Sequence, residues 1–403
     1  MYTDDMNTPK TLLLLGRQPK LGIAELESLY GSADITPLGD GAVVSQLEAT
    51  QIDFARLGSS IKLCAVTAHI ANTNWKMIEK ALLKTAPTMF SETAEGKIHL
   101  GLSVYGAKMS PLDVHATALR IKKVIRAKTG RSVRAVPNTA MHLSSAQVVH
   151  HQLTKDNGLE IVVYISGGSA FITKTVAEQD IEAYSRRDQN RPKRDARVGM
   201  LPPKLAQTII NLAAADTAPS HDIAVLDPFC GTGVILQEAA LQGYGAYGSD
   251  LEKRMIEYTR TNLEWLSETH GLPPIDPALE VGDATEHNWG KSIDIVACEG
   301  YLGQPFSAWP DEAKLRSVVN TCNQIMKGFL KNIGKQIAPG TRLCVALPAW
   351  HNPNGTFVHL PLLDQLDDLG YNQVSFVHTR TEDLLYYRPD QVVARELTVI
   401  TKQ

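Results

Sequence analysis

Val225-Leu226-Asp227-Pro228-Phe229-Cys230-Gly231-Thr232-Gly233 is the stretch that decides the fold of the second half of this chain. The apolar residues before it predict a buried parallel strand, its glycines a tight turn that lets backbone approach a ligand, and residues 234–242 the following helix. Asp250 ends the next predicted strand, about 20 residues after the loop, which suits an acid that reaches ribose hydroxyls. The pattern predicts a nucleotide-type cofactor site.

The glycine loop also narrows the kind of cofactor. It lacks the third glycine of a dinucleotide fingerprint and the Gly-Lys-Ser/Thr of a phosphate loop, which disfavours a pyrophosphate ligand. S-adenosylmethionine has no phosphate and carries a sulfonium cation, which suits the acids Asp227 and Asp250, and Asp283 is placed to contact the adenine amine. The alternative is that these are ordinary turn residues, because Gly and Asp favour strand ends in any α/β protein. We predict a methyltransferase domain with cofactor-binding residues Asp227, Phe229, Gly231, Thr232, Gly233, Asp250, Leu251, Asp283 and Ala284.

The length and composition of the chain limit the number of domains and the class of protein it can form. The 403 residues predict two or three domains, and a net charge of −3 gives no overall sign of nucleic-acid binding. The sequence has no apolar run of about 18 residues to span a membrane, and residues 1–10 lack the features of a signal peptide. The five cysteines are scattered without a Cys-x-x-Cys pair, so neither a zinc site nor a disulfide framework is indicated. We expect a soluble, cytoplasmic protein without a bound metal.

Three regions follow from the patterning. Residues 1–180 predict an α+β region, 181–203 a connector rich in Arg, Lys, Asp and Pro, and 204–403 a doubly wound, Rossmann-like sheet. A helix expected at 19–29 places Leu21, Ala24 and Leu29 on its buried face and Glu25 and Glu27 outside. Strands are expected at 11–15, 42–47, 66–70, 98–104, 133–136, 159–166, 223–226, 245–248, 279–281, 293–297, 343–347 and 373–377, with a hairpin within 383–400.

Positive charge is concentrated in two segments. Residues 120–134 hold seven cations and no acid, on a predicted helix with Leu119, Val124 and Ala127 inward, and residues 186–197 hold six cations and two acids. Each segment is either a solvated surface or a phosphate-binding patch, and an adjacent methyltransferase domain favours the second interpretation. The candidate RNA-binding residues are Arg120, Lys122, Lys123, Arg126, Arg186 and Arg187.

Several motifs in order resemble one known family, the THUMP-domain tRNA guanine-N2 methyltransferases, over nearly the full length. The resemblance implies a ferredoxin-like subdomain plus a THUMP module in residues 1–180, which would grip tRNA and present a nucleotide to the catalytic domain. Some members work with a small zinc-binding activating partner, so such a partner is an open question, and we expect a monomer. The motifs are Leu12–Glu27, Gln179–Pro192, Gly199–Ala206, Asp227–Gly233 and Tyr387–Gln391.

The catalytic loop departs from that family. After its fourth strand the family usually reads Asp-Pro-Pro-Tyr-Gly, whereas residues 298–303 read Cys-Glu-Gly-Tyr-Leu-Gly. By the resemblance, an acid and a carbonyl accept hydrogen bonds from the guanine amine and an aromatic ring stacks on the base. Prolines hold such a loop in one shape, whereas Gly300 is permissive. We expect Glu299 to accept from the amine and Tyr301 to hold the base, as catalytic residues.

Other functions stay open from the sequence. A tRNA-binding protein that has lost methyl transfer would also keep the cofactor loop, although intact Asp227 and Asp250 disfavour complete decay. An amino-group methyltransferase acting on another base, including adenine N6 of DNA, would share the loop and the chemistry. A covalent mechanism through Cys298 is disfavoured because no proline or base-activating acid accompanies it.

Overall fold

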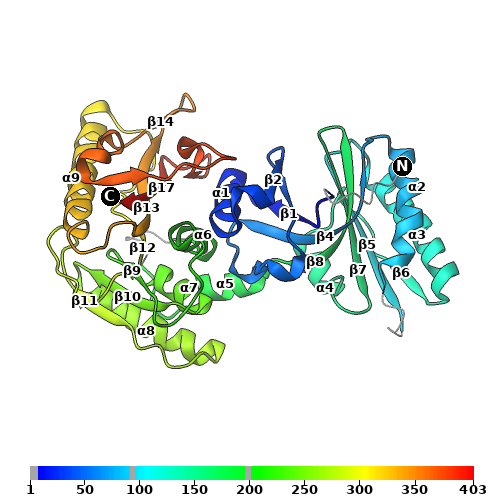
Figure 1. Ribbon diagram of the computed structural model, residues 1–403, viewed down its shortest axis with the longest axis horizontal. Coiled ribbons are helices and arrows are strands. Elements are labelled where there is room, and N and C mark those ends of the chain that lie inside the picture. Colours follow the sequence, from blue (N-terminus) through cyan, green and yellow to red (C-terminus); the bar gives the residue numbers. More distant parts are fainter. Residues whose placement is uncertain (1–7, 91–95, 196–200) are drawn as a thin grey trace. The chain divides into compact units, whose positions relative to one another are not determined.

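The computed structural model describes residues 8–90, 96–195 and 201–403 (Figure 1). The chain forms two compact units, each described here by itself. The first comprises residues 1–19, 33–55 and 60–182, and the second comprises 20–32, 56–59 and 183–403. Most of the segment examined for a signal peptide, together with Arg197, Gly199 and Met200 of the predicted motifs, lies outside the described residues.

The first unit is built on one eight-stranded sheet with the order β2-β3-β1-β4-β8-β7-β5-β6. Figure 1 shows α2 and α3 on one side of β5 and β7 and α4 on the other, and apolar residues of both strands pack beneath α2 and α3. The sequence patterns missed β2 and β8. The elements are β1 (Thr11–Leu15), β2 (Ile35–Leu38), β3 (Ala42–Ser45), β4 (Ser60–Ile70), β5 (Ile98–Tyr105), β6 (Val133–Ala135), β7 (Gly158–Ser166), β8 (Ser169–Glu178), α2 (Trp75–Thr85), α3 (Pro111–Thr129) and α4 (Ser145–His150).

Helix α3 carries the first basic segment, but its buried face differs from the predicted one. Ile121 and Ile125 are fully buried, whereas Leu119 is 40% exposed and Ala127 is also exposed. The prediction that Leu119 and Ala127 point inward was therefore wrong. The helix turns Ile121 and Ile125 to the sheet. Its buried face, and with it the stripe of cations, is therefore displaced by about one position from the predicted one.

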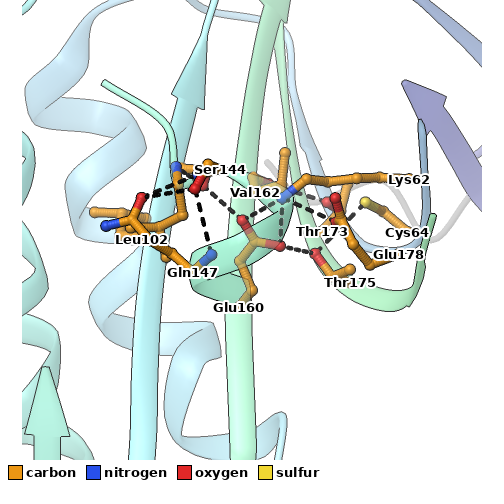
Figure 2. A network of polar contacts seen from close by, with 12 residues as sticks. Lys62, Cys64, Leu102, Ser144, Gln147, Glu160, Val162, Thr173, Thr175 and Glu178 are labelled. Atoms are coloured by element: carbon orange, nitrogen blue, oxygen red, sulfur yellow. Dashed lines mark hydrogen bonds and ion pairs between the residues drawn. The ribbon is translucent and has the colours of Figure 1, made fainter. Parts of the chain in front are cut away.

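A buried ionic cluster crosses the first sheet on the face opposite α2 and α3 (Figure 2). The Nζ of Lys62 lies 2.6 Å from the carboxylate of Glu160 and 3.2 Å from that of Glu178. Ser103 and Thr175 donate hydrogen bonds of 2.6 and 2.7 Å to Glu160. Burial lowers the pKa of Lys62, but the two carboxylates outweigh it, so the pKa is raised and the amine stays charged.

The second unit is built on a nine-stranded sheet with the path β11-β10-β9-β12-β13-β17-β15, to which β14 and β16 add at β13 and β17. Strands β9 to β13 are parallel, and β17 runs antiparallel between β13 and β15. Strand β16 pairs antiparallel with β17, as the predicted hairpin requires. The elements are α1 (Pro19–Tyr30), α5 (Ile181–Gln189), α6 (Pro203–Ala214), β9 (Ala224–Asp227), α7 (Val234–Gln242), β10 (Gly245–Asp250), α8 (Lys253–His270), β11 (Ala278–Val281), β12 (Ile295–Glu299), α9 (Glu312–Ile333), β13 (Arg342–His351), β14 (Phe357–Val358), β15 (Tyr371–Gln373), β16 (Leu385–Tyr386) and β17 (Val393–Lys402).

Helices cover both faces of this sheet. Residues of α6 and α7 pack with Val225 of β9 on one face, and the buried side of α9 packs with Leu226 on the other. Adjacent residues of β9 thus enter different cores, which is the arrangement of a strand buried on both faces. The doubly wound prediction is confirmed. Among the described residues, none of the helices is both apolar and long enough to cross a membrane.

Helix α1 is anchored in the second unit by a buried acid. Glu25 accepts hydrogen bonds from the amides of Gly58 and Ser59, both at 2.9 Å, and from Nδ2 of Asn211 at 2.7 Å. A Cβ on Gly58 would lie 2.1 Å from the carbonyl oxygen of Lys204, so a side chain there would push α6 away. The prediction that Glu25 faces solvent was wrong, because three donors compensate its burial.

Candidate cofactor pocket and catalytic loop

The glycine loop joins β9 to α7 as predicted. Gly231 and Gly233 have φ of +50° and +82°, a region that side chains rarely adopt. A Cβ on Gly233 would also lie 2.8 Å from the side chain of Thr259. Two glycines therefore make the turn and let its backbone face the space at the carboxyl end of β9.

Side chains of α8 hold this loop in place. The hydroxyl of Thr259 donates to the carbonyl of Gly231 at 2.9 Å, and Nδ2 of Asn262 donates to that of Thr232 at 2.9 Å. Asn262 also exchanges two 2.9 Å hydrogen bonds with the backbone of Lys193. Neither residue was predicted as part of the site, because a single polar residue on a helix carries no motif.

The loop opens onto a pocket at the carboxyl ends of β9 and β12. Asp227 at the end of β9 and Glu299 at the end of β12 both line it. The structure thus brings together the predicted cofactor loop and the predicted catalytic acid. Sequence reasoning missed four of the lining residues, although Leu201 lies in a motif already noted. The full lining is Leu201, Asp227, Phe229, Cys230, Gly231, Thr232, Val234, Ile235 and Glu299.

Two acids, Asp227 and Glu299, line the pocket. Asp227 is 2% exposed, and its Oδ1 accepts a hydrogen bond of 3.0 Å from the amide of Phe229. Burial raises the pKa of Asp227 well above its usual value, and the nearby Asp250 and Glu299 add to the shift. A cation in the pocket would relieve this cost by pairing with the carboxylate. The acidic lining of the pocket therefore fits a ligand with a positive centre, such as a sulfonium or an ammonium group.

Of the other predicted cofactor residues, Gly233 belongs to the loop itself, and Asp250, Leu251, Asp283 and Ala284 lie at or just after the ends of neighbouring strands and do not line this pocket. Asp250 accepts from the amides of Gly231 and Glu252, both at 2.9 Å, so it braces the loop. Leu251 is 69% exposed, and its side chain is available to cover a flat ligand. Asp283 accepts from the amide and hydroxyl of Thr285, at 2.8 and 2.7 Å, and Ala284 is buried in the core.

Glu299 is fixed by a partner that the sequence did not reveal. Nε of Arg395 in β17 is ion-paired with Oε1 of Glu299, and both side chains are largely buried. The amide of Gly300 donates to the carbonyl of Ala346 at 3.0 Å, which ties the start of the loop to β13. Gly303 has φ of +76°. The loop is thus anchored by an ion pair and a sheet hydrogen bond in place of two prolines.

The remaining loop residues divide clearly by exposure. Tyr301 is 43% exposed, so its ring is accessible to a ligand, but it does not line the pocket. Cys298 is fully buried, and burial raises the pKa of its thiol well above the usual value. A reactive cysteine needs an accessible thiolate, which this residue lacks. Cys230 accepts a 3.7 Å hydrogen bond from the hydroxyl of Thr259 and packs in a small core.

The candidate RNA-binding residues separate into exposed and structural ones. Lys123, Arg126 and Arg186 are exposed, and Lys122 is partly so. Arg120 is ion-paired with Glu79. Arg187 is only 9% exposed and donates to both carboxylate oxygens of Glu238, at 2.8 and 3.2 Å. We therefore withdraw Arg187 as an RNA contact, since it joins α5 to α7.

Within the described residues, no cluster of three or more His, Cys, Asp or Glu side chains is arranged to hold a metal.

The sheet order and the glycine loop define a Rossmann-like α/β domain with an acid-lined pocket at the carboxyl ends of its parallel strands. Residues 219–387 match the family model of a methyltransferase domain. This span contains the glycine loop, Glu299 and the aromatic residues near the end of the chain.

Individual proteins extend the comparison. The chain is 29% identical over 150 residues to the tRNA (guanine(10)-N2)-dimethyltransferase of Methanothermobacter thermautotrophicus, which is 37% of this chain and 39% of that protein. It is 37% identical over 134 residues to the enzyme of the same name from Pyrococcus abyssi, or 32% of this chain and 37% of that protein. The matches thus span about two fifths of these relatives. The crystal structure of TrmN from Thermus thermophilus shares the fold, with a TM-score of 0.51, 19% identity and coverage of 98% of this chain and 99% of that one.

Proposed function

We propose that this protein is an S-adenosylmethionine-dependent tRNA methyltransferase that forms N2-methylguanosine. The observation that carries the proposal is the pocket at the carboxyl ends of β9 and β12, where Asp227 and Glu299 line the space onto which the glycine loop opens. Support for the substrate comes from the two relatives named as tRNA (guanine(10)-N2)-dimethyltransferases, which match over about a third of this chain.

Asp227, Phe229 and the loop from Gly231 to Gly233 would hold the cofactor. When bound, S-adenosylmethionine supplies an electrophilic methyl group on a sulfonium centre. Asp227 offers a buried carboxylate to that positive charge, and the loop amides and carbonyls approach closely because no side chains intervene. Asp250 and Asp283 hold the neighbouring strand ends, and Leu251 offers an exposed apolar surface.

Glu299 would act on the acceptor amine. The amine of guanine is a weak nucleophile because its lone pair is delocalised into the ring, so catalysis depends on alignment and on acceptors for its hydrogens. Arg395 holds the carboxylate of Glu299 at the pocket wall. Tyr301, with 43% of its surface exposed, would stack on the extruded base. The reaction needs no covalent intermediate, which agrees with the burial of Cys298.

The first unit would supply affinity for tRNA. On α3, exposed Lys123 and Arg126 and partly exposed Lys122 offer charge to phosphates, and Arg186 on α5 adds a cation in the second unit. Recognition of folded RNA depends largely on shape and backbone contacts, so such a surface needs no base-specific groups. We place the enzyme in the reducing cytoplasm, in keeping with five buried, unpaired cysteines.

A single-turnover assay with labelled S-adenosylmethionine and unmodified total tRNA tests this function, with nucleoside analysis of the product. The wild type is expected to form N2-methylguanosine. Glu299→Gln should lose transfer while keeping cofactor affinity, and Asp227→Asn should lose both. A labelled product at another base would redirect the proposal to that base, and binding of cofactor and tRNA without transfer by the wild type would refute catalysis.

A further inference from the structure

Three aromatic side chains from separate segments gather near the carboxyl end of β13. His351, the last residue of β13, lies directly opposite Phe357 of β14, and their rings stack with centroids 4.9 Å apart. Tyr387, which follows β16, lies 5.2 Å from each of these rings. All three side chains are partly exposed. We call His351, Phe357 and Tyr387 the aromatic platform.

The hairpin that carries two of these rings is fixed by its own turn. The side chain of Asn352 accepts from the amide of Asn354 at 2.8 Å, and its carbonyl accepts from the amide of Gly355 at 2.9 Å. Gly355 has φ of +84°, as the turn requires. The hairpin holds its rings in place before any ligand arrives, so a ligand that stacks there orders little additional chain.

The platform lies at the same edge of the sheet as the catalytic loop. Glu299 pairs with Ala346 of β13, and β13 continues five residues farther to His351, about 16 Å at the rise of an extended strand. Arg395, the partner of Glu299, pairs with Tyr386, which precedes Tyr387. A continuous path of strand contacts therefore leads from the pocket wall to the three rings. In Figure 1, β14 lies beside β13 in this part of the unit.

We propose that the aromatic platform stacks a nucleobase next to the target in the RNA chain, which keeps the neighbouring nucleotides splayed while the target base occupies the pocket. The inference rests on the proposed function. Extruding a base costs stacking and pairing energy, and stacking on an aromatic side chain offsets part of this cost whatever the identity of the base. Arg388, exposed beside Tyr387, adds a positive charge suited to a phosphate of the same segment. A platform used only to pack the hairpin would have no effect on RNA.

Steady-state methyl transfer with an unmodified tRNA transcript tests the platform. Phe357→Ala should raise KM for tRNA about 5- to 100-fold, in line with the loss of one stacked base, and leave the Kd for S-adenosylmethionine unchanged. Phe357→Tyr should restore the KM, because it keeps an aromatic face. A purely structural role predicts a lower melting temperature for Phe357→Ala and no change in KM, which would overturn the inference.

A binding measurement separates this inference from the proposed function. A single-stranded RNA oligonucleotide that contains 2-aminopurine should be quenched by the wild-type protein and by Phe357→Tyr, but not by Phe357→Ala. Trp265→Ala is the matched control, since this partly exposed ring lies near the carboxyl end of α8 in the same unit. Equal quenching by wild type and Phe357→Ala would refute the platform even if methyl transfer occurs. Quenching that depends on Phe357 without any transfer would refute the proposed function alone.

Discussion

Nε of Arg395 is ion-paired with the carboxylate of Glu299 across β13, with side chains 12% and 16% exposed respectively. The pair joins the antiparallel strand β17 to the end of β12, so the position of the acid depends on a strand outside the parallel core. Glu299 lines the pocket and Arg395 does not. A change at Arg395 should therefore affect the chemistry through the position of Glu299.

Arg395→Met should therefore lower kcat for methyl transfer about 100-fold, since a small misplacement of a catalytic group has effects of that size. The Kd for S-adenosylmethionine should stay within twofold, because Asp227 and the glycine loop are untouched. Arg395→Lys should recover part of the rate by restoring a cation. Arg380→Met, at an exposed arginine paired with Asp383, is the control. A wild-type kcat in Arg395→Met would mean that Glu299 needs no positioning.

Asp227 should trade stability for cofactor binding. Burial raises the pKa of Asp227 in the folded state above its unfolded value. The contribution of this group to stability is therefore fully present below about pH 4, the unfolded pKa, and is lost as pH rises toward the folded pKa. Asp227→Asn removes that loss. In the absence of cofactor, we expect the variant to melt at a higher temperature than the wild type, with a difference that grows as pH rises above about 4.

The same substitution should weaken S-adenosylmethionine about 10- to 100-fold, which corresponds to the loss of one interaction with a charged group. Calorimetric titration measures this change, and differential scanning calorimetry measures the melting. A variant that melts lower than the wild type at pH 8 would show that the ionised carboxylate stabilises the loop, contrary to the argument from burial.

The sequence predicted the parts of the site that depend on neighbours along the chain. The loop from Asp227 to Gly233 combines a strand, a turn and a helix within a few residues, so its pattern is local, and the helix at 234–242 has the predicted bounds. Asp250 likewise ends its strand as expected. The assignment of Glu299 rested on the resemblance of residues 298–303 to a family's catalytic loop, and the structure places this acid beside the glycine loop because the carboxyl ends of parallel strands share one edge of the sheet.

Long-range pairing explains what the sequence did not predict. Arg395 lies 96 residues from Glu299 and belongs to a strand that inserts between β13 and β15, an order that no local pattern specifies. Glu25 was expected at the surface from the helical period and Arg187 from its place in a basic connector, yet each is buried with partners from distant segments. Burial of a charge depends on compensating groups, and these are identified only once the chain is folded.

The basic residues of α3 and Arg187 should respond differently to mutation. The double variant Lys123→Glu/Arg126→Glu should raise the Kd for tRNA at least about 10-fold and reduce the salt dependence of log Kd by about 1.5 to 2, one counterion per lost contact. Arg120→Ala should change it less, because Arg120 is ion-paired with Glu79. Arg187→Ala should leave the salt dependence unchanged.

Arg187→Ala should instead lower the free energy of unfolding by about 3–5 kcal/mol, since it leaves the buried carboxylate of Glu238 without its partner. Filter binding over a range of salt concentrations and urea unfolding separate the two effects. A reduced salt dependence in Arg187→Ala at full stability would return this residue to the RNA surface.

The buried cluster of the first unit gives a further test of how charge is compensated. Lys62→Met removes the cation shared by Glu160 and Glu178 and should cost about 3–5 kcal/mol in urea unfolding of this unit. Glu178→Gln should cost far less. Burial raises the pKa of Glu178 and so weakens the preference for its ionised form, which makes an amide a closer substitute for this side chain. Because its folded pKa is raised, the contribution of Glu178 to the free energy of unfolding is greatest below about pH 4.3 and declines above it. The cost of Glu178→Gln should therefore shrink as pH rises above about 4.3, and a loss as large as that of Lys62→Met would show that Glu178 is held ionised by Lys62.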